Sequence, residues 1–392
     1  MADPAPSTLD DDLWALGVHD AHCHPTDTMS LVSAIPDRRT RTLTIMATRE
    51  HDQDLVAQVA RTHGVDLPPP SSSSSVSTST CRVVPCFGWH PWYSHLLLDD
   101  TDATPPPSKA EHYASVLLGD PSAEFIAALP DPLPLSVFLS QTRQRLVEFP
   151  SALIGEVGID RTFRIPYPEA LGGASTSTGG PAGGHSRLSP HRVAMDHQRR
   201  VLVAQLRLAG EMQRAVSVHG VGAHGVLYDV FKGLFAGYEK KVRSRQTQKR
   251  GPYDFAGDES SSEDEGEGDG GGEKVRPFPP RVCLHSFSAP VEVLGTWLAG
   301  TVPADVYFSF SRAVNLEDGA GKFAGVVKVV PAERVLVESD LDNASEQVEL
   351  DLAAVVRRVA EERGWELERT VRQLGENWQR FVYGGGGDGG EK

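Results

Sequence analysis

Two histidines near the N-terminus have the spacing of a pair of metal ligands. His22 and His24 lie in the run Asp20-Ala-His-Cys-His, which follows a short apolar stretch. If this stretch is a strand, residues at i and i+2 share one side, so both imidazoles can reach a single ion. Asp20 can hold or tune such ligands, whereas Cys23 points the other way and is expected in the core. The pair predicts a metal site only if other parts of the chain supply further ligands.

Further imidazoles and carboxylates do follow apolar runs elsewhere. They are His90, Glu156, His219, His285 and Asp340. Imidazole and carboxylate without thiolate suit Zn²⁺, Mn²⁺ or Mg²⁺. Six candidate ligands are more than one catalytic ion with an open coordination position needs. They are the two N-terminal histidines, Glu156, His219, His285 and Asp340. We therefore expect two divalent metal ions bridged by Glu156, a buried carboxylate that needs a cation. Such pairs of ions hydrolyse phosphate esters or amides through an activated water.

The elements that must position these side chains alternate regularly along the chain. Apolar, β-branched runs expected as strands lie at 13–22, 43–48, 82–88, 152–159, 215–219, 281–287, 305–311 and 335–339. Stretches with helical periodicity lie at 52–62, 111–129, 135–148, 191–213, 223–239, 289–299, 318–330, 346–363 and 367–381. This alternation indicates parallel strands joined by crossover helices. About 290 residues remain outside loop insertions, which is close to the size of one α/β (β/α)₈ TIM-like barrel. In such a barrel the chemistry lies at the C-terminal ends of the strands, where the candidate ligands fall.

The predicted domain organisation is a single TIM-barrel metallohydrolase domain over residues 13–383. Residues 1–12 and the Gly-rich tail 384–392 are expected to be disordered. Flexible insertions are expected at about 67–80, 101–109, 172–186 and 241–280. These Pro-, Ser- or Gly-rich stretches contain too few apolar residues to offset the entropy of ordering them.

The charge of the chain bears on its partners. The net charge is −15, and residues 258–273 hold eight acids and no base. The remaining chain is still acidic, which counts against tight, non-specific nucleic-acid binding through phosphate neutralisation. A small site where metal ions supply the positive charge is compatible with this balance. The acidic 258–273 insertion is a candidate contact for a protein partner, and its serines suit an acid-directed kinase.

Cysteine usage and hydropathy bear on location. No apolar run approaches the length of a membrane span, and the acidic, Pro-rich N-terminus does not resemble a signal peptide. The four cysteines include no Cys-x-x-Cys pair and read as reduced thiols. We therefore expect an intracellular protein, cytoplasmic or nuclear, that does not associate with membranes.

Taken in order, the motifs resemble those of the TatD-related, metal-dependent DNases of the amidohydrolase superfamily, and most closely a fungal branch of them. They are Asp20-Ala-His22-Cys-His24, Gly88-Trp-His90-Pro, Gly155-Glu156-Val-Gly-Ile-Asp160, Gln205-Leu-Arg-Leu-Ala209 leading into Val216-Ser-Val-His219, His285-Ser-Phe-Ser288 and Glu338-Ser-Asp340. They extend over essentially the whole folded chain, and they are specific only together. The resemblance implies a TIM-like barrel with two divalent ions, usually a monomer. It also implies deoxyribonuclease activity on DNA, often as a 3′→5′ exonuclease.

The resemblance also implies roles for individual residues. One ion would be held by His22, His24, Glu156 and Asp340, and the other by Glu156, His219 and His285. His90 would contact a substrate phosphate rather than a metal ion. We expect Glu156 and Asp340 to be the catalytic carboxylates, with Asp340 accepting the proton of the attacking water.

The sequence departs from the family pattern at the expected phosphate contacts. An arginine usually stands two residues after the histidine that ends strand five, and Val221 stands there in this chain. Ala289 replaces a glycine, and Arg161 replaces an aromatic residue. Arg161 is our candidate for the missing phosphate-binding cation, with Arg164 as a second choice.

Two other functions stay open at this point. Related barrels hydrolyse amides, lactones or aminoacyl esters, but many of them carry a carboxylated lysine where this chain has Glu156. The carboxylate therefore favours a phosphoesterase. A third hypothesis is a non-catalytic barrel retained as a binding partner, against which the complete ligand set argues.

Overall fold

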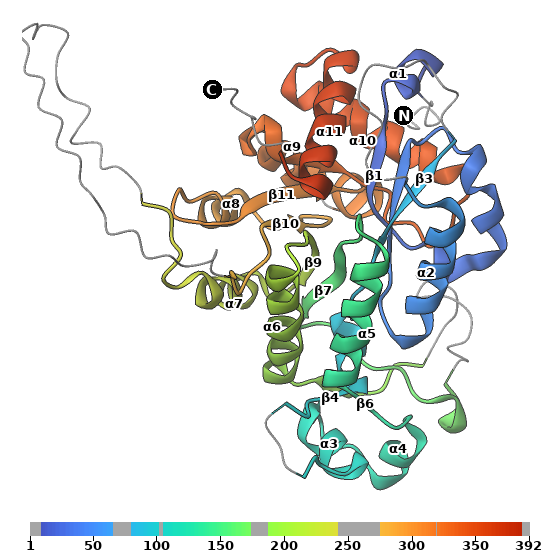
Figure 1. Ribbon diagram of the computed structural model, residues 1–392, viewed down its shortest axis with the longest axis vertical. Coiled ribbons are helices and arrows are strands. Elements are labelled where there is room, and N and C mark those ends of the chain that lie inside the picture. The colour runs from blue at the N-terminus through green and yellow to red at the C-terminus, as the bar shows by residue number, and fades with distance from the viewer. Residues whose placement is uncertain are drawn as a thin grey trace, which may run out of the picture.

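Parallel strands form a closed barrel in the computed structural model of the chain (Figure 1). The structure describes residues 9–65, 80–101, 105–173, 187–241, 275–318 and 320–385. Within these ranges the barrel strands are β1 (His19–Cys23), β2 (Thr42–Met46), β3 (Arg82–Cys86), β7 (Ile154–Asp160), β9 (Val216–Val221), β10 (Arg281–Leu284), β11 (Asp305–Phe310) and β12 (Val335–Val337). They pair in the orders β1-β2-β3 and β7-β9-β10-β11-β12, parallel throughout.

Backbone hydrogen bonds close the barrel at the two seams between these sheets. The N–H of Gly155 donates to the carbonyl of Phe87 across β3 and β7, at 3.3 Å. The N–H of Asp340 donates to the carbonyl of His22 across the ends of β12 and β1, at 3.0 Å. Each predicted strand run overlaps one barrel strand, so the predicted TIM-like barrel is confirmed. The near-continuous apolar runs are strands buried on both faces, as parallel sheets require.

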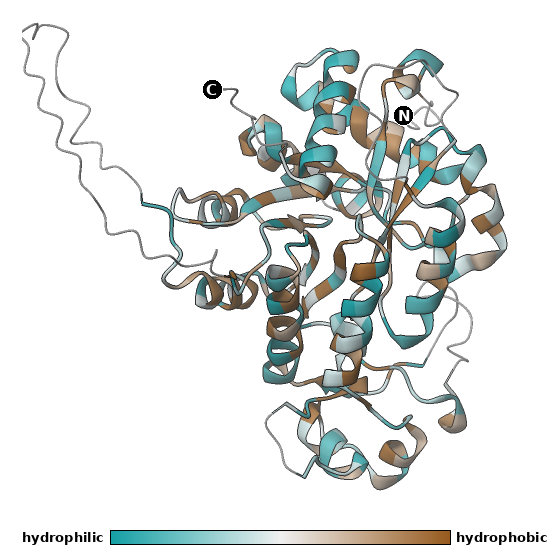
Figure 2. Ribbon diagram, in the orientation of Figure 1, coloured by the Kyte–Doolittle hydropathy of each residue, from teal (hydrophilic) through white to brown (hydrophobic). Residues whose placement is uncertain are grey.

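Helices surround the barrel and turn their apolar faces toward it (Figure 2). They are α2 (Glu50–His63), α5 (Leu135–Glu148), α6 (Met195–Glu211), α7 (His224–Phe235), α8 (Val291–Trp297), α9 (Ala320–Val329), α10 (Gln347–Arg363) and α11 (Leu367–Tyr383). Segments of 3₁₀-helix are η1 (Pro25–Asp37), η2 (Pro91–Leu96), η3 (Glu169–Leu171) and η6 (Ala332–Arg334), and η5 (Arg312–Asp318) is a π-helix.

The first predicted strand run differs from the structure at its start. Residues 11–15 form helix α1 (Asp11–Ala15), and the strand begins only at His19. Asp11 and Asp12 stand in the first turn, where carboxylates favour a helix N-terminus. Gly17, with φ +100°, turns the chain between helix and strand.

The chain between β3 and β7 builds a lobe outside the barrel, at the lower end of Figure 1. It contains α3 (Lys109–Val116), α4 (Ala123–Ala128) and the short strands β4 (Leu97–Leu98), β5 (Leu117–Leu118) and β6 (Leu133–Pro134), with β8 (Arg192–Val193) pairing to β5. The prediction of one helix over 111–129 is wrong, because Gly119 at φ +90° and Pro121 separate α3 from α4. The lobe has its own small apolar core, which includes Tyr113 and Phe125.

Helix α11 covers the N-terminal end of the barrel. Its Trp378 and Phe381 pack among the residues inside the barrel. Arg281 at the start of β10 donates from Nε to the carbonyl of Phe381 at 2.6 Å, and Asn377 donates to the carbonyl of Val335 at the start of β12 at 2.8 Å. This end is therefore filled, and the C-terminal end of the barrel is left for a site.

Two predicted flexible segments extend too far. Leu9 is buried in the main core although residues 1–12 were expected to be disordered. Phe278, inside the predicted insertion 241–280, is fully buried against Phe235 and Tyr238, with ring centroids 5.1 and 5.4 Å away. A single buried apolar side chain anchors each segment. The average composition of a segment does not reveal such a residue, so the prediction missed both. In the predicted insertion 101–109 only residues 102–104 lie outside the described residues, whereas Ser108 caps helix α3 and Lys109 is its first residue. The predicted insertions 67–80 and 172–186, the rest of 241–280 and the tail lie largely outside the described residues.

All four cysteines are buried free thiols, and Cys23 lies in the core as predicted. In the part of the chain that the structure describes, no helix combines the length and the apolar character needed to cross a membrane.

Candidate metal centre

The predicted ligands meet at the C-terminal rim of the barrel, around a pocket of about 200 Å³. The side chains that line it are His24, Asp27, Thr48, His90, Trp92, Tyr93, Glu156, His219, His285, Asp340 and Asp342. Most of them follow the ends of different strands, so residues up to 318 positions apart in the chain line one pocket. His22 lies beneath the pocket and is fully buried.

Glu156 on β7 is the centre of this arrangement. Its Oε1 lies 2.7 Å from Nε2 of His285 and 2.9 Å from Nδ1 of His219. Its Oε2 lies 3.4 Å from Nε2 of His24 and 3.6 Å from Nε2 of His22. One carboxylate oxygen thus faces the ligands expected for one ion, and the other faces those expected for the second. This is the geometry that a bridging carboxylate needs.

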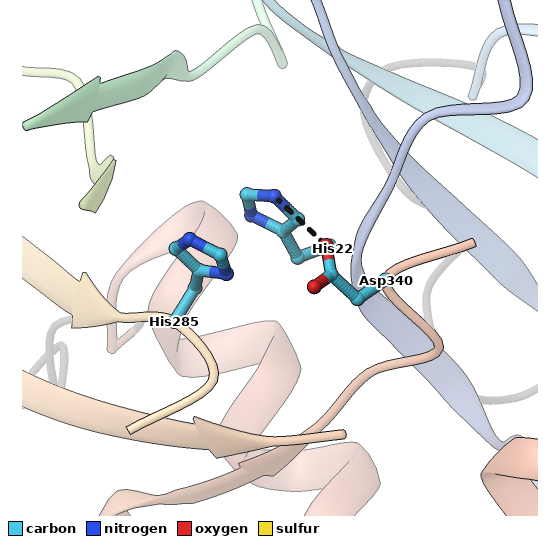
Figure 3. Close-up of side chains that lie close together, drawn as sticks. All are labelled: His22, His285 and Asp340. Atoms are coloured by element: carbon cyan, nitrogen blue, oxygen red, sulfur yellow. Dashed lines mark ion pairs between the residues drawn. The ribbon is translucent and has the colours of Figure 1, made fainter. Parts of the chain in front are cut away.

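His22, His285 and Asp340 approach one another from different parts of the barrel (Figure 3). The rings of His22 and His285 stack with centroids 4.0 Å apart, and Oδ1 of Asp340 lies 3.7 Å from Nε2 of His22. The same oxygen lies 3.6 Å from Nε2 of His24. Asp340 has φ +56°, a left-handed conformation that aspartate tolerates better than most residues and that is common at functional sites.

The protonation state of His219 tests whether the site fits a cation. Burial alone would raise the pKa of Asp160, but hydrogen bonds from His219 and Trp92 hold this pKa below its usual range. Asp160 is therefore a carboxylate that can only accept, and Nε2 of His219, 3.1 Å from its Oδ2, must carry the hydrogen. Nδ1 faces the acceptor Oε1 of Glu156 at 2.9 Å, so this contact needs a proton or a metal ion beside it. Hydrogen bonds to Asp160 and Glu156 and the charge of Glu156 outweigh burial and raise the pKa of His219, which favours the proton. A divalent cation would take the place of that proton, so the residues fit one.

The hydrogen bonds of His90 favour a different role. Its Nδ1 accepts the backbone N–H of Trp92 at 3.1 Å, so in the neutral ring Nε2 carries the hydrogen. Burial lowers the pKa of His90 to about 4, which keeps the ring neutral near pH 7. Nε2 lies 3.1 Å from Oε1 of Glu156 and is placed to donate to it. His90 is close enough to group with Glu156 and His219 around an ion, but as a donor it suits a carboxylate or a phosphate oxygen better.

Burial and neighbouring charges set the acidity of the two predicted catalytic carboxylates. Burial alone would raise the pKa of Glu156, but the surrounding imidazoles outweigh it and hold this pKa well below its usual range. For Asp340 burial dominates and raises the pKa to about 6. Glu156 therefore stays charged, whereas Asp340 can exchange a proton near neutral pH.

Several buried polar residues hold the candidate ligands in place. Ser217 lies 2.8 Å from Nδ1 of His22, through its Oγ. Asp20 accepts the N–H of His22 at 3.1 Å and the N–H of Ser339 at 3.0 Å, so it ties β1 to the segment that carries Asp340. The predicted supporting role of Asp20 thus operates through the backbone.

Asp160 and Ser217 were not among the predicted site residues, although the sequence contains a signal for both. Asp160 stands four residues after Glu156, and Ser217 stands two residues before His219. In a strand these spacings put each pair on one face. Gly158 between the two acids is also constrained, because a Cβ there would clash with the carbonyl of His219.

The predicted phosphate-binding arginines are not brought to the pocket. Arg161 and Arg164 are both exposed and are absent from the pocket lining. Their position follows from the loop after β7, where Asp160 accepts the backbone N–H groups of Thr162 and Phe163 and turns the chain. Arg49 is closer, since its guanidinium lies 4.8 Å over the ring of the pocket residue Tyr93 and donates to the Tyr93 hydroxyl at 3.0 Å.

Comparison with known proteins identifies the family of the chain. The profile of the family described as TatD related DNase matches residues 19–383. Cut9-interacting protein scn1 of Schizosaccharomyces pombe is 34% identical over 368 residues, 93% of this chain and 98% of that protein. Uncharacterized deoxyribonuclease YMR262W of Saccharomyces cerevisiae is 26% identical over 321 residues, 78% of this chain and 84% of that protein.

Solved structures share the fold. The TatD homologue YJJV from Escherichia coli superimposes with a TM-score of 0.50 at 14% identity, covering 94% of this chain and 98% of that one. An uncharacterized amidohydrolase from Saccharomyces cerevisiae gives a TM-score of 0.50 at 12% identity, covering 91% and 93%. The family match, together with the clustered imidazoles and carboxylates, identifies the chain as a metal-dependent hydrolase. The chain belongs to the family of TatD-related DNases.

Proposed function

We propose that the chain is a deoxyribonuclease that cleaves DNA phosphodiester bonds, in the manner of a 3′→5′ exonuclease, with two divalent ions. The observation that carries this proposal is the position of Glu156, whose two oxygens face two different groups of imidazoles. Membership of the TatD-related DNases and the relative named as a deoxyribonuclease support DNA as the substrate.

In this proposal His22, His24, Glu156 and Asp340 would hold one ion, and Glu156, His219 and His285 would hold the other. When bound, the ions would supply an activated water and neutralise charge on the phosphate. Asp340 accepts the proton of the attacking water and passes it to the leaving oxygen, because its carboxylate lies in the pocket beside Nε2 of His22 and of His24. His90 donates from Nε2 to a phosphate oxygen or to Glu156, and Asp160 keeps the lone pair of His219 directed at the site.

Hydrolysis of an amide or an aminoacyl ester is the main competing activity. The same rim of the barrel could carry it, since the ligand set does not identify the substrate. The carboxylate of Glu156 in place of a carboxylated lysine favours the phosphodiester.

The test is a cleavage assay with end-labelled single- and double-stranded DNA in Mg²⁺, Mn²⁺ or Zn²⁺, and in a chelator. The same preparation is analysed for bound metal and offered an aminoacyl ester. We expect metal-dependent release of nucleotides by the wild-type chain and its loss in the variant carrying Glu156→Ala and Asp340→Ala. Unchanged cleavage by that double variant, or hydrolysis of the aminoacyl ester alone, would contradict the proposal.

A protein partner is a second proposal, and it rests on one observation. The relative scn1 is named for its interaction with Cut9. We propose that this chain also binds a protein partner and that the acidic segment 258–273, which lies outside the described residues, takes part. Binding of the full chain and of a chain lacking 258–273 to the Cut9 counterpart of the same cell tests it. Equal binding would exclude the acidic segment, and no binding by either chain would exclude the partner.

A further inference from the structure

The pocket of the candidate metal centre has no basic side chain of its own. Its described lining contains the carboxylates of Asp27, Glu156, Asp340 and Asp342 and no lysine or arginine. Two divalent ions would only balance these carboxylates when all of them are ionised, which leaves no positive charge over for a phosphodiester. A cleft attracts an anion when its positive charge outweighs its negative charge. A nuclease site of this composition therefore needs a cation that reaches the phosphate from the edge of the pocket.

Arg49 stands at this edge, three residues after the end of β2. Its neighbour Thr48 lines the metal pocket. Arg49 itself lines a groove of about 950 Å³ that shares Trp92 and Tyr93 with the pocket. Among the residues that the structure describes, it is the one lysine or arginine in the lining of that groove. The chain therefore has an arginine at the end of one barrel strand, although Val221 occupies the usual arginine position at the end of another.

Contacts on both the backbone and the side chain hold Arg49 in place. Its backbone N–H donates to Oδ1 of Asp52 at 2.9 Å, and its carbonyl accepts from the side-chain amide of Gln53 at 3.1 Å. Its guanidinium lies 4.8 Å from the ring centre of Tyr93 and donates from Nη1 to the Tyr93 hydroxyl at 3.0 Å. The head group is therefore positioned before a ligand arrives, which lowers the entropy cost of binding.

The head group of Arg49 still has donors to offer. A guanidinium carries five N–H donors, and stacking on an aromatic ring uses its face rather than its edge. The hydrogen bond to Tyr93 takes one donor, and no carboxylate among the described residues forms an ion pair with Arg49. Asp52 accepts instead from the backbone N–H groups of Thr48 and Arg49 and from the Thr48 hydroxyl. A part-buried guanidinium without a carboxylate partner is suited to a phosphate oxygen.

We propose that Arg49 binds a phosphate of the DNA at the metal centre, in place of the arginine that the family usually carries two residues after the position of His219. The inference rests on the proposed nuclease function and adds a substrate-binding residue to it. Tyr93, which lines both the pocket and the groove, positions the guanidinium. Because the contact is to a phosphate, it strengthens binding to every DNA sequence and is weakened by salt.

Binding of DNA in which single phosphates are altered is the direct test. Fluorescence anisotropy gives the dissociation constant of a labelled oligonucleotide, single-stranded and duplex, with Ca²⁺ present and cleavage in the same samples followed on a gel. In one series of oligonucleotides each phosphate in turn is replaced by a neutral methylphosphonate. The variants are Arg49→Met, which removes the charge, and Arg49→Lys, which keeps it. The matched control is Arg334→Met, because Arg334 also lies over a tyrosine, 5.0 Å from the ring centre of Tyr307, at the opposite end of the barrel.

Arg49→Met should weaken DNA binding about 10- to 100-fold, the size of a lost hydrogen bond to a charged group. The slope of the logarithm of affinity against the logarithm of salt concentration should become shallower by about 0.7 to 0.9, the contribution of one phosphate. Arg49→Lys should keep the wild-type slope and lose only part of the affinity, because lysine keeps the charge but not the fork of donors. The control should bind as the wild type does. One methylphosphonate position should weaken binding by the wild type but not by Arg49→Met, and it identifies the phosphate that Arg49 contacts.

The outcomes separate this inference from the proposed function. Wild-type affinity and salt dependence in Arg49→Met, equal sensitivity of both proteins to every methylphosphonate, or no DNA binding by the wild type would each overturn the role of Arg49. If the wild type cleaves DNA in any of these cases, the nuclease function stands without it. If Arg49 contributes to DNA binding but no divalent ion supports cleavage, the phosphate contact stands and the nuclease function fails.

Discussion

Replacing Asp160 by asparagine is expected to weaken metal binding without unfolding the chain. Oδ1 of Asp160 accepts from the backbone N–H groups of Thr162 and Phe163, and an amide oxygen can keep both contacts. The amide nitrogen then takes the place of Oδ2, which accepts from His219 Nε2 and Trp92 Nε1. His219 must in turn become an acceptor at Nε2 and carry its hydrogen on Nδ1, the atom that faces Glu156.

The magnitude follows from these contacts. A hydrogen on Nδ1 removes one ligand lone pair, and loss of such an orienting partner typically weakens metal affinity by about 10- to 100-fold. The indole N–H of Trp92 loses its acceptor in a part-buried position, which costs about 1–3 kcal/mol of folding free energy. This loss of metal affinity corresponds to about 1.4–2.7 kcal/mol, which is similar in size to the folding loss. A chain whose stability is about 5–15 kcal/mol stays folded under such a loss, so the change in affinity can be measured on the folded protein.

Competition with a coloured chelator for Zn²⁺ or Mn²⁺ measures the metal affinity, and urea unfolding measures the stability. Cleavage by Asp160→Asn should recover as the metal concentration is raised. Asp351→Asn is the matched control, since Asp351 is a buried carboxylate on α10 that accepts from Arg312 and Gln347, away from the centre. Wild-type metal affinity in a folded Asp160→Asn protein would refute the reasoning.

Two further predictions concern stability. Burial lowers the pKa of His95 to about 3 and of His197 to about 4, against an ordinary value of 6.5, so unfolding takes up protons below that value. The free energy of unfolding should fall by about 1.4 kcal/mol per pH unit for each histidine between pH 6 and 4.5, and should not respond to them above pH 7.5. Urea unfolding midpoints measured across this pH range test the prediction. His197→Gln should reduce the number of protons taken up on unfolding by about one, and an unchanged dependence of stability on pH in this variant would contradict the prediction. Leu9→Ala should lower the free energy of unfolding by about 2–4 kcal/mol in the same assay, because Leu9 is only 1% exposed. The control Leu118→Ala changes a side chain that is 54% exposed and should lower it by less than about 0.5 kcal/mol. Equal losses in the two variants would show that the N-terminal segment is not anchored.

Local sequence patterns were sufficient to predict the barrel and many of the residues of the candidate site. Each strand of a parallel barrel is buried on both faces, so it is visible as an apolar run, and a polar residue that closes such a run stands out. Glu156 is conspicuous for this reason, as are His219 and His285. The predicted bounds of flexible segments were wrong where a single apolar side chain is buried in the core although the segment around it is polar. Leu9 and Phe278 are the two examples.

What the sequence by itself determined is which residues reach the rim, because the barrel topology brings every strand end to the same place. Only the tertiary structure decided how those residues face one another. Trp92 and Asp160 are 68 positions apart, yet their hydrogen bond, together with that of His219, fixes which imidazole nitrogen keeps a lone pair. The same packing leaves Arg161 in solvent and places the lobe beside the loop after β7, where the two line a groove of about 950 Å³. These features depend on contacts between distant segments, which neither composition nor periodicity encodes locally.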